Sequence, residues 1–102
     1  MGMRVAEVEV RLRRFGPKAR LRVDLHGVSI FGPGDQHRAI RWEWIEEMHA
    51  GSGLTVRSAN DAITIPAGTF GLTPEALGER LEQAKSITRR TDVIAELAGG
   101  PG

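Results

Sequence analysis

The chain has 102 residues, of which 40% are hydrophobic and 26% are charged, and it has no cysteine. This predicts one globular domain spanning 1–102, and it argues against a disordered or fibrous chain, disulfides and thiolate metal sites. The formal net charge of +1 gives no global attraction to nucleic acid or membrane. No apolar run approaches the roughly 18 residues that span a bilayer, and the start lacks a signal-peptide core, so we expect a cytoplasmic protein.

The first part of the chain, about residues 4–66, alternates apolar and polar residues in short runs. Every second residue is apolar between residues 5 and 12, and the same period returns over residues 19–25, after the Gly16-Pro17 turn signal. A period of two is typical of antiparallel strands with one face in water. The pattern therefore predicts a β-hairpin.

Gly27 marks the point where the apolar residues change from odd to even positions. Val28 and Ile30 would face inward in a third strand, and a tight turn or bulge at Gly27 would absorb the change. Residues 32–36, GPGDQ, cannot continue a strand ladder and are expected to form a loop.

Both tryptophans lie within residues 40–45, IRWEWI. As a strand, this segment would point Ile40, Trp42 and Trp44 the same way, whereas as a helix it would leave Trp42 on the polar side. We interpret it as a strand that buries tryptophan in the core, after which residues 45–48 turn away from the sheet. A stacking platform for bases or sugars is the alternative role of the pair.

Two further short strands are expected at residues 54–57 and 63–65. A helix over about 74–98 follows, with Thr73 as its N-cap and Pro74 in its first position. This tail is either one long helix or a helix with a loose final segment. The expected fold is mainly β with a C-terminal helix: a bent antiparallel sheet or partly open barrel of six to seven strands, capped by one helix.

An ordered set of short motifs runs through about residues 20–85. A Gly-Val strand precedes an I-x-W-x-x-I segment, and a short meander and a helix follow. This order resembles the small bacterial pleckstrin-homology-like domains, at Gly27, Val28, Ile40, Trp42, Ile45, Leu54, Ile63, Ile65 and Phe70.

The resemblance implies a seven-stranded fold and a non-enzymatic module for binding or scaffolding. Only six strands can be counted in the sequence. Either residues 67–71, AGTFG, contain a short seventh strand, or the barrel is incomplete.

Basic residues are concentrated in the first hairpin, at Arg11, Arg13, Arg14, Lys18, Arg20 and Arg22. In lipid-binding pleckstrin-homology domains a Lys, spacer, Arg-x-Arg motif at the corresponding hairpin grips inositol phosphates, and Lys18, Arg20 and Arg22 resemble it loosely. The cluster is a candidate site for an anionic lipid headgroup or a phosphate. Its alternative is a solvated face partly balanced by nearby acidic residues.

The apolar stripe of the helix continues through Ile87, Ile94 and Leu97. We interpret this stripe first as the surface that packs onto the barrel as a lid. If these residues are exposed, they predict a subunit interface and a homo-oligomer.

Catalytic and metal-binding patterns are not evident. The histidines lack a metal-ligand spacing, no serine lies in a nucleophile-elbow context, and no glycine loop is suited to cradling phosphate. We therefore expect no enzymatic activity, cofactor or metal. The predicted function is binding of a protein partner or of a second copy, with anionic lipid as the alternative ligand; we do not expect nucleic acid to be the partner.

Overall fold

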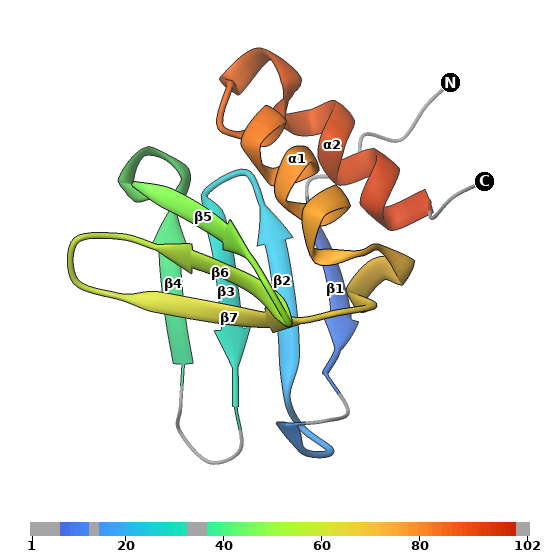
Figure 1. Ribbon diagram of the computed structural model, residues 1–102. Coiled ribbons are helices and arrows are strands. Elements are labelled where there is room, and N and C mark those ends of the chain that lie inside the picture. Colours follow the sequence, from blue (N-terminus) through green and yellow to red (C-terminus); the bar gives the residue numbers. More distant parts are fainter. Residues whose placement is uncertain (1–6, 13–14, 33–36, 100–102) are drawn as a thin grey trace.

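The computed structural model describes residues 7–12, 15–32 and 37–99. Within them, seven strands form two antiparallel sheets, and two helices follow (Figure 1). The mainly β fold with a C-terminal helical segment agrees with the prediction, although the described strands do not close into a barrel. The first sheet has the order β1-β2-β3-β4, with bounds Glu7–Arg11, Arg20–Asp24, Gly27–Phe31 and His37–Arg41.

The predicted first hairpin is present as β1 and β2. Val8 pairs with Val23 and Val10 pairs with Leu21, and these apolar residues face the interior. A backbone hydrogen bond of 2.8 Å from Leu12 to the carbonyl of Ala19 extends the pairing beyond the strands. The alternation in the sequence therefore corresponds to a hairpin with one buried face and one face exposed to water.

The turn between β2 and β3 accounts for the change of apolar parity. The Asp24 carboxylate accepts hydrogen bonds from the backbone N–H groups of His26 (2.9 Å) and Gly27 (3.0 Å), which is an Asx turn. Val23 then pairs directly with Val28, so both strands present apolar residues to the same side. Gly27 also lies close to β4, because a Cβ at this position would be 2.1 Å from the Ile40 carbonyl oxygen.

The prediction that residues 40–45 form a strand is correct only as far as Arg41. Trp42–Trp44 form a 3₁₀ turn, in which the N–H of Ile45 donates to the carbonyl of Trp42. Successive side chains rotate by about 120° in such a turn, so residues two apart no longer share a face. Trp42 is 1% exposed and Trp44 is 57% exposed, which confirms one buried tryptophan and corrects the placement of the other.

The seventh strand lies where the sequence predicted the chain to leave the sheet. The second sheet has the order β5-β6-β7, with bounds Glu47–Ala50, Gly53–Arg57 and Ala62–Pro66. Met48 and Ala50 of β5 pair with Val56 and Leu54 of β6. The alternative location in residues 67–71 is wrong, because Thr69–Gly71 form a second 3₁₀ turn.

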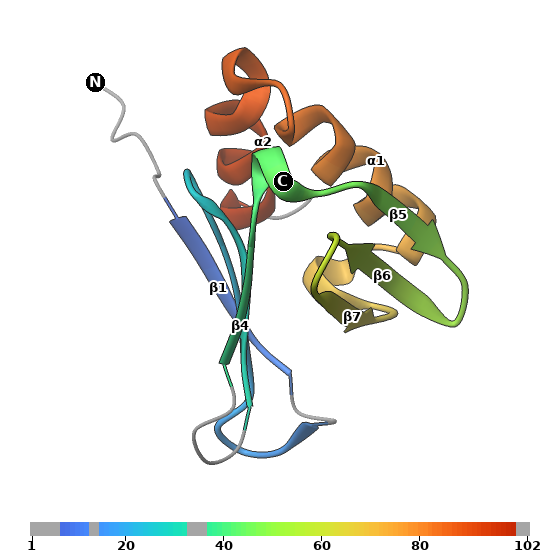
Figure 2. The same cartoon turned by 90° about the vertical axis from the view of Figure 1, so that its left-hand side faces the viewer.

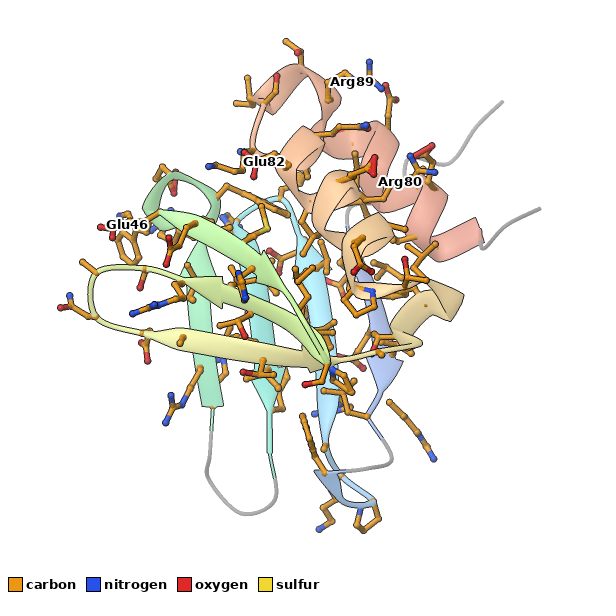
Figure 3. The ribbon with its side chains drawn as sticks, viewed as in Figure 1. Glu46, Arg80, Glu82 and Arg89 are labelled. Atoms are coloured by element: carbon orange, nitrogen blue, oxygen red, sulfur yellow. The ribbon has the colours of Figure 1, made fainter. Side chains whose placement is uncertain are left out.

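The C-terminal segment forms two helices, α1 (Pro74–Ala84) and α2 (Ile87–Gly99), instead of the single predicted helix. The predicted cap is present: the Thr73 hydroxyl accepts a 3.1 Å hydrogen bond from the N–H of Ala76. The helices lie over one end of the space between the sheets (Figure 2), where α1 contacts β5 and β6 and α2 contacts β1. Charged side chains of the helical layer, such as Glu82 and Arg89, lie on the outer surface (Figure 3).

The chain reversal between α1 and α2 turns the apolar stripe of α2 inward. Ile94 is 0% exposed and Leu97 is 6% exposed, whereas Ile87 is 77% exposed. The three residues therefore do not form one exposed interface: Ile94 and Leu97 belong to the core, as in the lid interpretation. No helix in the described part of the chain is long and apolar enough to cross a membrane.

Candidate functional site

The outer face of the first sheet carries the described part of the basic cluster. Both helices and the second sheet lie on the opposite side of this sheet (Figure 2). Two rows of paired residues cross the outer face, one running from Arg11 through Arg20 and Phe31 to His37, and the other containing Glu9 and Arg22. We call this surface the arginine face and define it as Glu9, Arg11, Arg20, Arg22, Phe31 and His37.

An aromatic pair forms the β3–β4 side of the arginine face. The rings of Phe31 and His37 are stacked, with centroids 4.5 Å apart and an interplanar angle of 5°. The guanidinium carbons of Arg20 and Arg22 lie 5.3 Å and 5.0 Å from the centroid of the Phe31 ring. Cations at this distance are attracted by the ring quadrupole, so the ring helps to hold both guanidinium groups in place.

Glu9 holds the same two arginines from β1. Its carboxylate accepts hydrogen bonds from Arg20 Nη1 at 3.4 Å and from Arg22 Nη2 at 3.2 Å. Arg22 Nε also donates to it, at 3.4 Å. The side chains of Arg20, Arg22 and Glu9 are 46%, 33% and 31% exposed, so the ion pairs add little stability but leave guanidinium donors open to solvent.

The remaining predicted basic residues have different positions. Arg11 is exposed and pairs directly with Arg20 across the strands, which places two like charges opposite each other. Lys18 is exposed in the turn that precedes β2. Arg13 and Arg14 lie outside the described residues. Three of the six predicted residues, Arg11, Arg20 and Arg22, therefore share the outer face.

Phe31 and His37 were not predicted as residues of this site. They belong to one site because β3 pairs with β4 in a register that brings these two residues together. That register is a property of the folded sheet. An apolar residue at an outward position of a strand, as at Phe31, is the only local hint.

A second polar network links the helices to the corner of the first sheet. Arg90 of α2 donates from Nε to the carbonyl of Ala84 (2.8 Å) and from Nη2 to the carbonyl of Lys85 (3.1 Å). These carbonyls lie at the end of α1, where intrahelical partners are lacking. Partial burial lowers the pKa of the Arg90 guanidinium below its ordinary value, and the Glu43 carboxylate opposes that shift.

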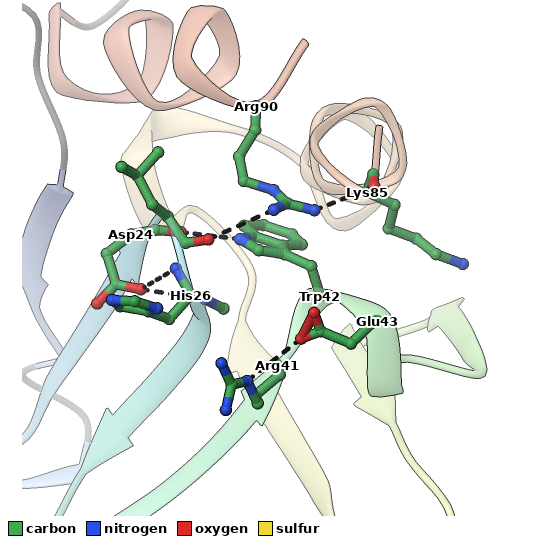
Figure 4. A network of polar contacts seen from close by, with 9 residues as sticks. Asp24, His26, Arg41, Trp42, Glu43, Lys85 and Arg90 are labelled. Atoms are coloured by element: carbon green, nitrogen blue, oxygen red, sulfur yellow. Dashed lines mark hydrogen bonds and ion pairs between the residues drawn. The ribbon is translucent and has the colours of Figure 1, made fainter. Parts of the chain in front are cut away.

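The same guanidinium stabilises the buried tryptophan (Figure 4). The Arg90 guanidinium carbon lies 5.2 Å from the centroid of the Trp42 ring. The indole Nε1 of Trp42 donates to the backbone carbonyl of Asp24 at 2.8 Å. This network is structural, because it joins α1, α2 and the β2–β3 turn around a side chain that is excluded from solvent.

Trp44 lies on the surface and lines a concavity together with Glu46 and Asp61. The Arg41 guanidinium lies 5.6 Å from its ring centroid and forms a 3.2 Å ion pair with Glu43. The two tryptophans thus have separate environments and do not form a joint stacking platform.

Within residues 7–12, 15–32 and 37–99, no group of three or more His, Asp or Glu side chains is arranged to hold a metal ion. His37 is part of the arginine face, and His26 contributes its backbone to the Asx turn.

No family model matches the chain, and no curated protein sequence or solved structure is significantly similar to it.

Proposed function

We propose that the chain is a non-enzymatic binding module of the pleckstrin-homology-like type, which binds an acidic segment of a protein partner through the arginine face. The order of a four-stranded antiparallel sheet, a three-stranded antiparallel sheet and a C-terminal helical segment supports this class, since the resemblance implies seven strands and a terminal helix.

The observation that carries the proposal is the carboxylate of Glu9 between Arg20 and Arg22. The arginine face already holds one carboxylate with charge-assisted hydrogen bonds, and the same donors would hold the carboxylates of a partner. Arginine keeps its charge at all physiological pH values, so it suits recognition better than proton transfer. The stacked Phe31 and His37 rings add apolar contact area beside these charges.

Removal of the two arginines tests the proposal. In Arg20→Gln/Arg22→Gln the affinity for an oligoglutamate peptide should fall roughly ten-fold, because two partly exposed charge pairs are lost. Isothermal titration calorimetry at low salt measures this change. The matched control Arg57→Gln/Arg80→Gln removes the same charge from ion pairs with Glu47 and Glu96, and it should retain the affinity of the unaltered chain.

Two outcomes would contradict the proposal. One is the absence of measurable oligoglutamate binding by the unaltered chain. The other is an equal loss of affinity in the control, which would assign binding to net charge alone. Thermal unfolding followed by circular dichroism checks that both double variants remain folded.

Replacing Glu9 should raise the affinity for oligoglutamate instead of lowering it. Because its carboxylate occupies donors of Arg20 and Arg22, Glu9→Gln should raise the affinity for oligoglutamate roughly three- to ten-fold. Glu47→Gln is the control, since Glu47 forms a similar surface ion pair with Arg57 on the other sheet. An unchanged or lower affinity in Glu9→Gln, measured by the same calorimetry, is incompatible with an arginine face that binds carboxylates.

An anionic lipid headgroup is the alternative ligand, and the Arg11–Arg20 pair favours it. Like charges directly opposite each other in a sheet are destabilising, and a phosphate between them would relieve the repulsion. Each basic residue near an anionic surface contributes about 1 kcal/mol of attraction. Salt-sensitive binding to phosphatidylserine vesicles, with no binding to phosphatidylcholine vesicles or to oligoglutamate, would favour this alternative.

A second copy of the chain is a protein partner with suitable charge. Glu43, Glu46 and Asp61 line the concavity beside Trp44, which offers acidic groups to the arginine face of a neighbour. Sedimentation velocity at low and high salt distinguishes self-association from binding of a different protein. Association that disappears at high salt and in Arg20→Gln/Arg22→Gln identifies the second copy as the partner.

A further inference from the structure

A cavity of about 420 Å³ lies between the two sheets, lined by the end of β3, the start of β4 and the start of β7. This end of the first sheet is remote from the helices (Figures 1 and 2). Its lining includes Phe15, Ile30, Arg38 and Ile63, together with Phe31 and His37 of the arginine face. A volume of roughly 300–1,000 Å³ is usual for small-molecule sites.

The wall of the cavity is mainly apolar. Ile30 faces inward in β3 yet remains partly exposed, because the second sheet does not close over this end of the first. Ile63 belongs to the buried core, and Phe15 is 41% exposed beside the cavity. An apolar group placed here would remove the exposed surface of Ile30 and Phe15 from water, which favours its binding.

The permanently charged group at the cavity, which His37 and Thr64 also line, is the guanidinium of Arg38. It donates to the backbone carbonyl of Ala62 at 3.4 Å and lies 3.8 Å from the Asp61 carboxylate. Its side chain is 61% exposed, so donors remain for another anion. The two contacts hold the guanidinium between β4 and β7, at the border between the apolar wall and solvent.

We infer that this cavity binds an anionic amphiphile with a single hydrocarbon tail, the tail lying against Ile30, Phe15 and Ile63 and the head group pairing with Arg38. A carboxylate and a phosphate monoester share this chemistry. The cavity shares Phe31 and His37 with the arginine face, but its charged group differs: Arg38 contacts Ala62 of β7, whereas Arg20 and Arg22 pair with Glu9 on the outer face. The inference therefore goes beyond the proposed function.

The test uses the full chain and three probes below their aggregation concentrations: decanoate, decyl phosphate and decanol. Decanoate or decyl phosphate should bind and shift the amide NMR signals of Ile30, Arg38 and Ile63. In Arg38→Gln the affinity for the anionic probe should fall roughly five-fold, while the affinity for decanol should not change. Comparison of the two anions identifies the preferred head group.

Arg41→Gln is the matched control, because Arg41 lies in the same strand, is exposed and does not line the cavity. It should bind the anionic probes as the unaltered chain does. Ile30→Trp, which fills the cavity, should abolish binding of all three probes. If this variant fails to fold, the comparison of Arg38→Gln with Arg41→Gln still tests the inference.

The inference is overturned if neither anionic probe binds the unaltered chain. It is also overturned if Arg38→Gln and Arg41→Gln have equal affinity for the anionic probe that the unaltered chain binds better, or if the NMR shifts fall on α1 and α2 instead of on β3, β4 and β7.

Discussion

Replacing Trp42 with alanine should lower the free energy of unfolding by roughly 3–5 kcal/mol. Trp42 is 1% exposed and is the largest fully buried side chain, so its removal leaves a cavity at the corner between the two sheets and the helices. The indole also receives the Arg90 guanidinium on its face and donates to the Asp24 carbonyl. The loss therefore includes packing, a hydrogen bond and a cation–π contact.

Trp44→Ala is the matched control, because the same side chain is deleted two residues away at 57% exposure. This variant should lose less than about 1 kcal/mol, since it loses mainly the exposed contact with Arg41. Urea unfolding gives both free energies. The tryptophan fluorescence of the folded Trp44→Ala variant should be blue-shifted, as expected for a buried indole, and equal costs for the two variants would contradict the structure.

Gly27→Ala should destabilise the fold by about 3 kcal/mol or more, because the added methyl group meets backbone atoms. A Cβ at Gly27 would lie 2.1 Å from the Ile40 carbonyl oxygen and 2.7 Å from the Arg41 Cα. These atoms belong to the paired strand β4, so no side-chain rotation relieves the clash. The β3–β4 pairing would have to open next to the Trp42 corner.

Gly51→Ala is the control for this prediction, since nothing lies within 4 Å of a Cβ at Gly51 in the β5–β6 turn. Its free energy of unfolding should stay within roughly 0.5 kcal/mol of the original. Urea unfolding of the two variants in parallel makes the comparison. A Gly27→Ala variant as stable as Gly51→Ala would mean that β3 and β4 do not approach as closely as described.

The sequence predicted those elements whose two faces differ in polarity. Alternation over β1 and β2 located the first hairpin, and the change of parity located the turn at Gly27. β5 was missed because its four residues, EMHA, contain one large apolar side chain, so alternation is not visible. Its position is fixed by pairing with β6, which is a contact between segments and not a local preference.

The errors in the tryptophan segment and the helical tail have related causes. Periodicity over six residues cannot separate a strand from a strand followed by a turn, and the hydrogen bond from the Trp42 N–H to the His26 carbonyl depends on the β2–β3 turn. The break between α1 and α2 lies at residues 85–86, where Arg90 binds the α1 carbonyls from the next helix. Contacts between distant segments therefore determine both where β4 ends and where the helical tail breaks.

The candidate site was predicted in part. The basic residues of the first hairpin are evident in the sequence, and strand alternation is enough to place Arg20 and Arg22 on one face. The carboxylate of Glu9 between them and the stacked rings beneath them depend on cross-strand register. Register decides whether this cluster is a solvated surface or an arranged set of donors.

An NMR titration of the ¹⁵N-labelled chain with oligoglutamate tests most directly whether the arginine face is the binding surface. We predict that the largest amide shifts fall in β2, β3 and β4, at Arg20, Arg22, Phe31 and His37, and that they are larger in Glu9→Gln. Shifts confined to the helices or to the surface around Trp44, or no shifts at low salt, would contradict the proposed function.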